Sequence, residues 1–104
     1  MVDFGVPSGP EQSGERPAII MQHDDVTPAL MTVIVMPLTT NLKRLSLPTT
    51  CLIPLGEGGL DHDSVALCHQ IQVQGKVRLR YRRGELSEDR LAEIQNCLLD
   101  TLGM

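Results

Sequence analysis

Aromatic side chains are scarce in this chain of 104 residues, which contains one Phe, one Tyr and no Trp. Proteins that bind single-stranded nucleic acid without sequence preference stack the bases on a platform of aromatic rings, and this sequence cannot supply such a platform. The formal net charge of −4 also argues against binding of nucleic acid through bulk positive charge. If the protein binds RNA, it must therefore do so at a local site.

Long apolar runs are also absent from the sequence. A helix that spans a bilayer needs about 20 consecutive apolar residues, and no run of this chain approaches that length. The first residues lack the charged and then apolar pattern of a secretory signal peptide. We therefore expect a cytoplasmic protein with no membrane partner. The length is that of one domain, so we expect a single domain over residues 1–104.

The three cysteines, Cys51, Cys68 and Cys97, are odd in number and scattered, so they do not indicate a disulfide framework. Each has apolar neighbours, which favours buried and reduced thiols. Cys68 precedes His69 in a predicted strand. Adjacent residues of a strand point to opposite faces, so this thiol and this imidazole are not expected to pair as nucleophile and base.

The sequence has no convincing pattern of metal ligands. Asp61, His62 and Asp63 are consecutive, and three consecutive residues of an extended chain cannot all converge on one ion. No second His or Cys group at ligand spacing supports them, so a solvated turn is the better interpretation, and residues 23–25 are interpreted in the same way. We expect no metal and no other cofactor.

Short segments of β-branched or alternating apolar residues, separated by Gly and Pro, predict a β-rich fold. The predicted strands cover residues 2–4, 17–22, 31–38, 49–55, 64–74 and 78–82. Pro37, near the end of a predicted central strand, suggests an edge or a bulge at that point. The alternation over residues 64–74 predicts that His69 faces the core together with Leu67 and Ile71.

One amphipathic helix is predicted at the C-terminus. Ser87 is a good candidate for its N-cap and Gly103 for its end. The apolar stripe of the helix consists of Leu91, Ile94, Leu98 and Leu102. Short strands followed by one helix predict a mainly β fold, namely a small β-barrel with a C-terminal helix.

Two polar residues lie at positions where a site could form. Arg16 stands between the Gly-rich loop 5–15 and the next predicted strand, and a plain surface arginine is the alternative. Thr39 ends the predicted central strand, where an ordinary strand-end hydrogen bond is the alternative. Spacing alone does not connect these two residues. Positive charge is gathered at Lys43 and Arg44 and again over residues 76–83, which the net charge hides.

Several segments, in order along the chain, resemble the MazF/PemK toxin family. They are Val2-Asp3-Phe4 followed by Gly9-Pro10-Glu11-Gln12-Ser13-Gly14-Glu15-Arg16-Pro17, then Thr32–Thr39 with Asn41 and Leu47-Pro48-Thr49, then Asp63-Ser64-Val65 running into Gln70-Ile71, and Gly84-x-Leu86-Ser87 before the helix. The Glu-Gln-x-Gly-x-Arg-Pro pattern is the most specific of these signals. The resemblance covers almost the whole chain.

This resemblance implies an SH3-like, CcdB-like β-barrel with a C-terminal helix, and a symmetric homodimer. The implied activity is that of a toxin, a sequence-specific and metal-independent endoribonuclease. It would cut single-stranded RNA, including mRNA, to 2′,3′-cyclic phosphate and 5′-hydroxyl ends. The implied partner is a cognate MazE-like antitoxin with an acidic, disordered tail. Family members usually have several more residues before the segment that begins at Val2, so we expect a shortened first strand.

The resemblance assigns catalysis to Arg16 and Thr39. Because the 2′-hydroxyl of the substrate is the nucleophile, the protein need only stabilise the transition state and help to move protons. Arginine offers planar donors to phosphate oxygens and stays protonated, so Arg16 would act through its charge. Thr39 would donate a hydrogen bond to the same oxygens.

The same resemblance suggests which residues bind RNA, since single strands expose base edges and phosphates. These residues are Glu11, Gln12, Asn41, Lys43, Arg44 and Gln70. His69 stands where the family often has an acidic residue. As an alternative to the core, it could lie in the RNA groove and act as a base, or contact a base edge or phosphate.

Two other functions remain open at this point. A CcdB-like protein poisons a topoisomerase, and the same fold serves both activities, so fold alone cannot choose between them. A catalytically inactive, dimeric relative is the second alternative. The motifs that contain Arg16 and Thr39 favour the nuclease.

Overall fold

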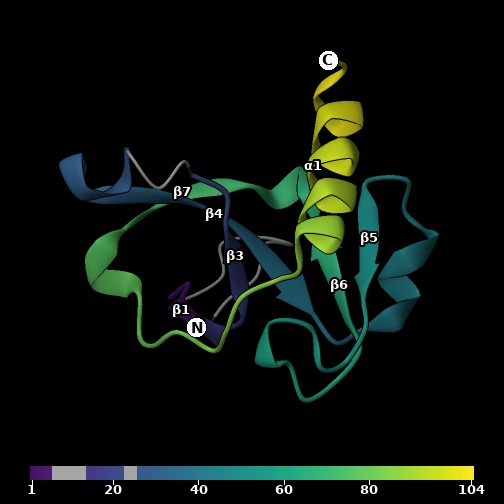
Figure 1. Cartoon of the computed structure of the whole chain (residues 1–104), viewed down its shortest axis with the longest axis horizontal. Helices are drawn as coiled ribbons and strands as arrows, with labels where there is room; N and C mark the ends of the chain where they lie inside the picture. Colours follow the sequence, from purple (N-terminus) through teal and green to yellow (C-terminus); the bar gives the residue numbers. More distant parts are fainter. Residues whose placement is uncertain (6–13, 23–25) are drawn as a thin grey trace.

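The computed structural model describes residues 1–5, 14–22 and 26–104 (Figure 1). The strands are β1 (Val2–Asp3), β2 (Glu15–Arg16), β3 (Ala18–Ile20), β4 (Thr32–Thr39), β5 (Thr50–Ile53), β6 (Ser64–Leu67) and β7 (Gln72–Gly75). Short 3-10 turns are η1 (Thr27–Ala29), η2 (Leu42–Ser46), η3 (Glu57–Gly59), η4 (Cys68–Gln70) and η5 (Lys76–Arg78), and the α-helix is α1 (Glu88–Leu102).

Strand β4 is the centre of a five-stranded antiparallel sheet. It pairs with β3 on one side and with both β7 and β6 on the other, and β5 continues the sheet beyond β6. Strands β1 and β2 form a separate two-stranded sheet. The predicted mainly β class with a C-terminal helix is confirmed. Within the part of the chain that the structure describes, the strands do not close into a barrel.

Pro37 lies inside the central strand although it has no N–H to donate to a neighbour. The N–H of Leu38 donates to the carbonyl oxygen of Pro17 on the β3 side (3.0 Å). Successive N–H groups of a strand point to alternate sides, so the nitrogen of Pro37 faces the side of β6 and β7. Strand β4 runs without a break through Pro37, and the interruption lies in the strand opposite it, so the predicted bulge is not seen in β4 itself. The alternative of an edge strand is wrong, because β4 is paired on both sides.

The interruption of the partner strand is the turn η4. The register of β4 with β7 and its register with β6 differ by three residues, and η4 accommodates the extra chain. The prediction of one continuous strand over residues 64–74 is therefore wrong. The alternation fails within η4, where Cys68 is buried and His69 is exposed instead of facing the core.

The prediction of a strand over residues 78–82 is also wrong. Only Leu79 forms a β-bridge, with Val2, and the N–H of Arg80 donates to the carbonyl oxygen of Met1 (2.9 Å). Strand β1 has two residues, so it offers too little backbone for a ladder. The segment with the alternating arginines therefore lies alongside the N-terminal residues without forming a strand.

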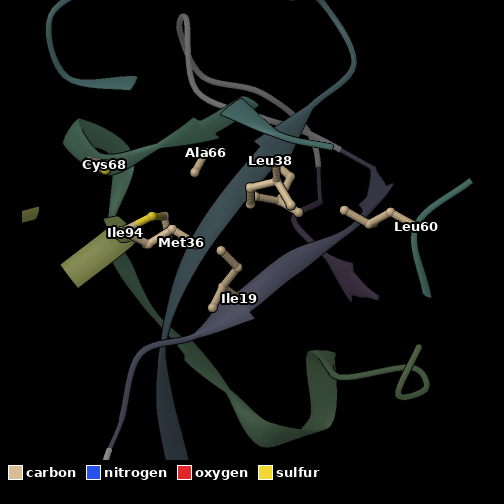
Figure 2. Packing of buried hydrophobic residues seen from close by; sticks show 8 residues of the cluster. Ile19, Met36, Leu38, Leu60, Ala66, Cys68 and Ile94 are labelled. Carbon is tan, nitrogen blue, oxygen red and sulfur yellow. The ribbon is translucent and has the colours of Figure 1, made fainter. Parts of the chain in front are cut away.

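The main core lies between the sheet and α1. Figure 2 shows Ile94 of the helix pointing towards Met36 of β4, close to Ile19 and Cys68. A smaller cluster of Val2, Val33, Val35 and partly buried neighbours occupies the β1 side of the sheet. The helix thus covers the sheet through the stripe that the sequence predicted, although only Ile94 of that stripe is fully buried.

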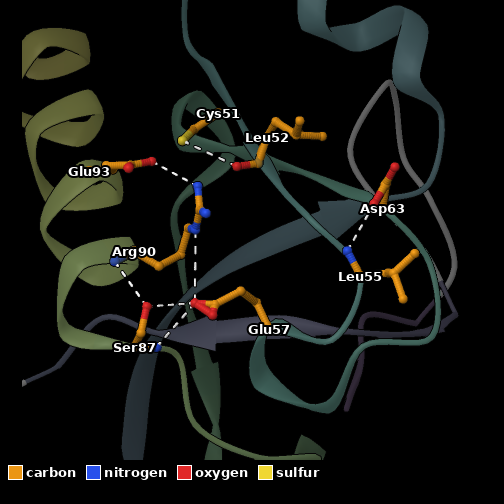
Figure 3. A network of polar contacts seen from close by, with 8 residues as sticks. All are labelled: Cys51, Leu52, Leu55, Glu57, Asp63, Ser87, Arg90 and Glu93. Carbon is orange, nitrogen blue, oxygen red and sulfur yellow. Dashed lines mark hydrogen bonds and ion pairs between the residues drawn. The ribbon is translucent and has the colours of Figure 1, made fainter.

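Both predicted caps of α1 are confirmed. The Ser87 hydroxyl accepts a hydrogen bond from the N–H of Arg90 (3.2 Å), and Gly103 adopts the left-handed conformation that ends many helices. Glu57 of η3 accepts a hydrogen bond from the same hydroxyl (2.6 Å), as Figure 3 shows. The hydrogen bond from Ser87 holds the pKa of Glu57 below its usual value. The η3 loop is thereby connected to the start of the helix.

The three free cysteines lie close together between β5, η4 and α1. Cys68 is fully buried and its Sγ lies 3.2 Å from Sγ of Cys97, whereas Cys51 and Cys97 are only partly buried. Burial, followed by the hydrogen bond and charge repulsion from Cys97, raises the pKa of Cys68 to about 12. The prediction of buried thiols is thus confirmed in full for Cys68 alone.

Cys68 is expected to resist alkylation by iodoacetamide in the native protein at pH 8. The thiolate is the reactive form, and a raised pKa keeps this thiol protonated at that pH. Mass spectrometry of labelled peptides should show slow modification of Cys68 in buffer and fast modification in denaturant. Equal rates under the two conditions would contradict the burial of this thiol.

No helix within the described residues is long and apolar enough to cross a membrane.

Candidate functional site

The pairing of β3 with β4 brings Arg16 and Thr39 to the same end of the sheet. Ala18 lies opposite Pro37, and the hydrogen bond from Leu38 to Pro17 continues this register by one residue. If the same register is continued by one more residue, Arg16 comes opposite Thr39. The spacing of these two residues in the sequence did not connect them. Arg16 is exposed, whereas Thr39 is 9% exposed.

The hydroxyl of Thr39 already accepts one hydrogen bond. The N–H of Asn41 donates to Oγ1 of Thr39 (3.2 Å). This leaves the hydroxyl proton of Thr39 available to donate to a substrate oxygen. The side chain of Asn41 in turn accepts from the N–H of Lys43 (3.2 Å) and so caps η2. The side-chain carbonyl oxygen of Asn41 is therefore occupied by the N–H of Lys43. The side-chain NH₂ group of Asn41 is the part that can contact a ligand.

The turn η2 presents the basic pair that the sequence predicted. The Thr50 hydroxyl of β5 donates to the carbonyl oxygens of Leu47 (2.8 Å) and Arg44 (3.1 Å), which fixes η2 against the sheet. Lys43 is exposed and Arg44 is half-buried, with its Nε unpaired among the described residues. Neither side chain forms an ion pair within that part of the chain.

The second basic group, over residues 76–83, differs from η2 because acidic side chains neutralise much of it. The pairs are Arg78 and Arg80 with Asp3, Arg82 with Glu85, and Arg83 with Asp61. Hydrogen bonds from the Gly5 N–H and from Arg80 lower the pKa of Asp3. Lys43 and Arg44 of η2 differ from this group in that neither has an acidic partner among the described residues.

His69 is an exposed residue of η4 and lies near the start of β5, the strand that follows η2 in the chain. Its Nδ1 is 2.7 Å from Oγ1 of Thr49, and the two groups share a hydrogen bond. Thr49 belongs to the Leu-Pro-Thr segment of the family resemblance, but no motif assigns it a role. An isolated threonine before a strand carries no signal of such a contact.

The structure thus brings together Thr39, Asn41, Lys43 and Arg44 through one chain of backbone and side-chain hydrogen bonds, and places His69 beside the following strand. Gln70 is half-buried in η4. Glu11 and Gln12 lie outside the described residues.

A cavity of about 720 Å³ lies elsewhere, between the N-terminus, β3 and residues 79–86. Its lining includes neither Arg16 nor Thr39, and its arginines belong to the paired basic group. Among the described residues, no group of three His, Cys, Asp or Glu side chains is arranged to hold a metal ion.

Comparison with known proteins gives consistent matches over most of the chain. Residues 1–102 match the family described as "PemK-like, MazF-like toxin of type II toxin-antitoxin system". The "Endoribonuclease MazF" of Staphylococcus epidermidis is 36% identical over 104 residues, which covers 100% of this chain and 87% of the relative.

Solved structures show the same fold. MazF (Form-I) from Deinococcus radiodurans superimposes with a TM-score of 0.82 at 25% identity and covers 99% of this chain and 90% of its own. The MazE-MazF complex (Form-II) from the same organism gives 0.77 at 25% identity, with 99% and 89% covered. Mycobacterium tuberculosis toxin MazF-mt6 gives 0.76 at 25% identity, with 86% and 87% covered.

Proposed function

Because the chain belongs to the PemK-like, MazF-like toxin family of type II toxin–antitoxin systems, we propose that it is an endoribonuclease that cuts single-stranded RNA, including mRNA, at specific short sequences. The full-length match to a relative named as an endoribonuclease supports this activity. The structural observation that carries the proposal is the register that leads Arg16 and Thr39 to one end of the sheet.

In the proposed reaction, the 2′-hydroxyl of the RNA attacks the adjacent phosphorus and the bond to the 5′-oxygen breaks. The products are a 2′,3′-cyclic phosphate and a 5′-hydroxyl end. One proton leaves the 2′-oxygen and one reaches the departing 5′-oxygen. Since the substrate supplies its own nucleophile, the chemistry requires neither a metal nor another cofactor.

Arg16 and Thr39 would stabilise the charge that develops on the phosphorus oxygens. The guanidinium of Arg16 is exposed and can meet two phosphate oxygens at once. Thr39 can donate its hydroxyl proton, because its Oγ1 already accepts from Asn41. Hydrogen-bond donors that are already in position stabilise the transition state more than the bound substrate, because the negative charge on the phosphorus oxygens is larger there. Such a site therefore lowers the activation barrier of cleavage.

We propose that η2 and η4 bind the RNA on either side of the reacting phosphate. Lys43 and Arg44 would contact phosphates, since their charges have no acidic partner among the described residues. Asn41 and Gln70 would read base edges. Glu11 and Gln12 keep the same proposed role, on the evidence of the sequence motif alone.

His69 has two possible roles in this scheme. As the base that accepts the 2′-hydroxyl proton, it would give a rate that rises with pH, because only the neutral ring can accept a proton. His69→Gln would then lose this rise and most of the rate. As a contact to RNA, His69 would affect the affinity for the substrate and leave the pH profile of kcat intact.

A MazE-like antitoxin is the proposed protein partner. The solved MazE-MazF complex of a relative supports this proposal. We propose that an acidic tail of the antitoxin occupies the RNA groove near Arg16, Lys43 and Arg44 and becomes ordered on binding. The tail and a substrate analogue should then compete, and simultaneous binding of both in the groove would contradict the proposal. The toxin would act in the cytoplasm, where mRNA is translated.

The chain is expected to form a two-fold homodimer. Leu99 and Leu102 of α1 are 44% and 55% exposed, although they are large and apolar. A second copy would cover this surface, as symmetric homo-oligomers commonly do. Sedimentation at micromolar concentration should give the mass of a dimer. A monomer alone under these conditions would contradict the expectation.

The main rival is a topoisomerase poison with the same fold. The two functions are distinguished by incubating the protein in EDTA with a long unstructured RNA and, separately, with a supercoiling reaction. Discrete cuts in the RNA support the nuclease. Intact RNA together with inhibited supercoiling would support the poison, and the absence of both effects would indicate an inactive relative.

A further inference from the structure

The exposure of His69 results from the break in the partner strand of β4. Because η4 interrupts this strand opposite Pro37, the side chain of His69 leaves the alternation that would have directed it into the core. Cys68, immediately before it, stays fully buried and anchors the turn. The histidine is thus an exposed side chain on a firmly held backbone.

Thr49 fixes this turn through two contacts. The carbonyl oxygen of Thr49 accepts from the N–H of Cys68 (3.0 Å), and its Oγ1 shares a hydrogen bond with Nδ1 of His69 (2.7 Å). The next residue, Thr50, is itself held by η2. Both ends of the contact therefore belong to well-anchored segments, which determine the direction of the ring as well as its position.

A hydroxyl can donate to a ring nitrogen or accept from it, so the direction of the hydrogen bond between Thr49 and His69 decides which ring nitrogen carries the proton. Among the described residues, the Thr49 hydroxyl has no partner other than His69. When this hydroxyl donates to Nδ1, the neutral ring carries its proton on Nε2, which faces away from Thr49. A ring in this form offers a donor to a ligand, and it has no lone pair at Nε2 to accept a proton.

We propose that Thr49 is a positioning residue that holds His69 as a hydrogen-bond donor to an RNA phosphate or base acceptor, beside the charges of η2. This inference rests on the proposed RNA cleavage and assigns His69 to substrate binding instead of proton abstraction. Thr50, the residue after Thr49, donates to the carbonyl oxygen of Arg44, so the backbone of η2, which carries Lys43 and Arg44, lies close to this turn. The hydroxyl, and not merely the volume, of Thr49 is required.

The protonation of the ring can be read directly by two-bond proton–nitrogen NMR correlation on the intact protein. In the wild type, His69 is expected to carry its proton on Nε2. In Thr49→Val, which keeps the shape and removes the hydroxyl, His69 should show the mixture typical of a free ring. His62 is exposed and its imidazole forms no hydrogen bond with the described residues, so it serves as a reference for such a mixture in the same spectrum.

Kinetics on a short RNA substrate separate positioning from general stability. Thr49→Val and His69→Leu, which has no donor, should each raise KM by about 5–10-fold, the scale of one lost hydrogen bond, with kcat changed by less than about twofold. Thr49→Ser retains the hydroxyl and should restore both the tautomer and KM. Thr101→Val, which removes a hydroxyl that donates to the Cys97 carbonyl oxygen on α1 (2.8 Å), is the matched control and should leave KM unchanged.

The double variant Thr49→Val/His69→Leu decides whether Thr49 acts through His69. It should be no worse than His69→Leu alone, because the two residues form one unit. A further rise of KM in the double variant, or an unchanged tautomer in Thr49→Val, would overturn the inference. If the wild type leaves RNA intact, the proposed function fails, and the tautomer spectrum alone then confirms or overturns Thr49 as the residue that positions His69.

Discussion

Replacing Arg16 with alanine is expected to lower the rate of RNA cleavage by about 100-fold or more, the scale on which one transition-state donor is lost. The register of β3 with β4, continued by one residue beyond Pro17 and Leu38, brings Arg16 to the end of β4 where Thr39 lies. Lys at this position should recover only part of the rate, because an ammonium group cannot make the bidentate contact of a guanidinium.

Arg82→Ala is the matched control for this prediction. Arg82 is also exposed, and its partner among the described residues is Glu85, outside the proposed site. Its loss should leave cleavage within about twofold of the wild type, as expected for an exposed ion pair. Thermal unfolding should be similar for both variants, since Arg16 is exposed. Normal cleavage by Arg16→Ala would remove this residue from the site.

Replacing Ile94 with alanine is expected to destabilise the fold by about 2–5 kcal/mol, the cost of deleting a large buried aliphatic side chain. Ile94 is the only fully buried residue of α1 and packs against Met36 and Cys68 (Figure 2). Urea unfolding followed by circular dichroism measures this change. Ile94→Val should cost about 0.5–1.5 kcal/mol and keeps the measurement possible if the alanine variant does not fold.

Leu99→Ala provides the comparison on the same helix. Leu99 is 44% exposed, so its truncation should cost about 1 kcal/mol or less in a monomer. If Leu99→Ala is as damaging as Ile94→Ala in protein that sedimentation shows to be monomeric, the helix does not dock in the orientation described.

The helix could be predicted almost completely from the sequence, because its signals are local. Ser87, Gly103 and the apolar spacing each act within a few residues, and the caps form as predicted. The central strand could be predicted for a similar reason, since eight consecutive residues of β4 carry β-branched or apolar side chains at most positions.

The break at η4 could not be predicted, because its cause lies on another strand. The alternation over residues 64–74 is regular, and the interruption becomes favourable only opposite Pro37, whose pairing is not visible in the sequence. The prediction of a strand over residues 78–82 was wrong for a related reason. A strand needs a partner, and β1 supplies only one residue, Val2, for a bridge.

The proposed site was predicted in its parts but not in its geometry. The family resemblance named Arg16, Thr39 and the residues of η2, whereas their arrangement depends on the register of β3 with β4 and on the hydrogen bond from Asn41 to Thr39. Thr49 was missed, since a hydroxyl that orients a histidine 20 residues away leaves no pattern in the sequence.

The central claim is that the RNA supplies its own nucleophile to a site formed by Arg16 and Thr39, without a metal. One measurement tests it most directly. Once a cleaved phosphate has been mapped, two oligonucleotides are compared in EDTA, one entirely RNA and one with a single 2′-deoxyribose immediately before that phosphate. The first should be cleaved to a 2′,3′-cyclic phosphate, and the second should not be cleaved at this phosphate. Equal cleavage of both would show that water or a protein group attacks the phosphorus, and would contradict attack by the 2′-hydroxyl.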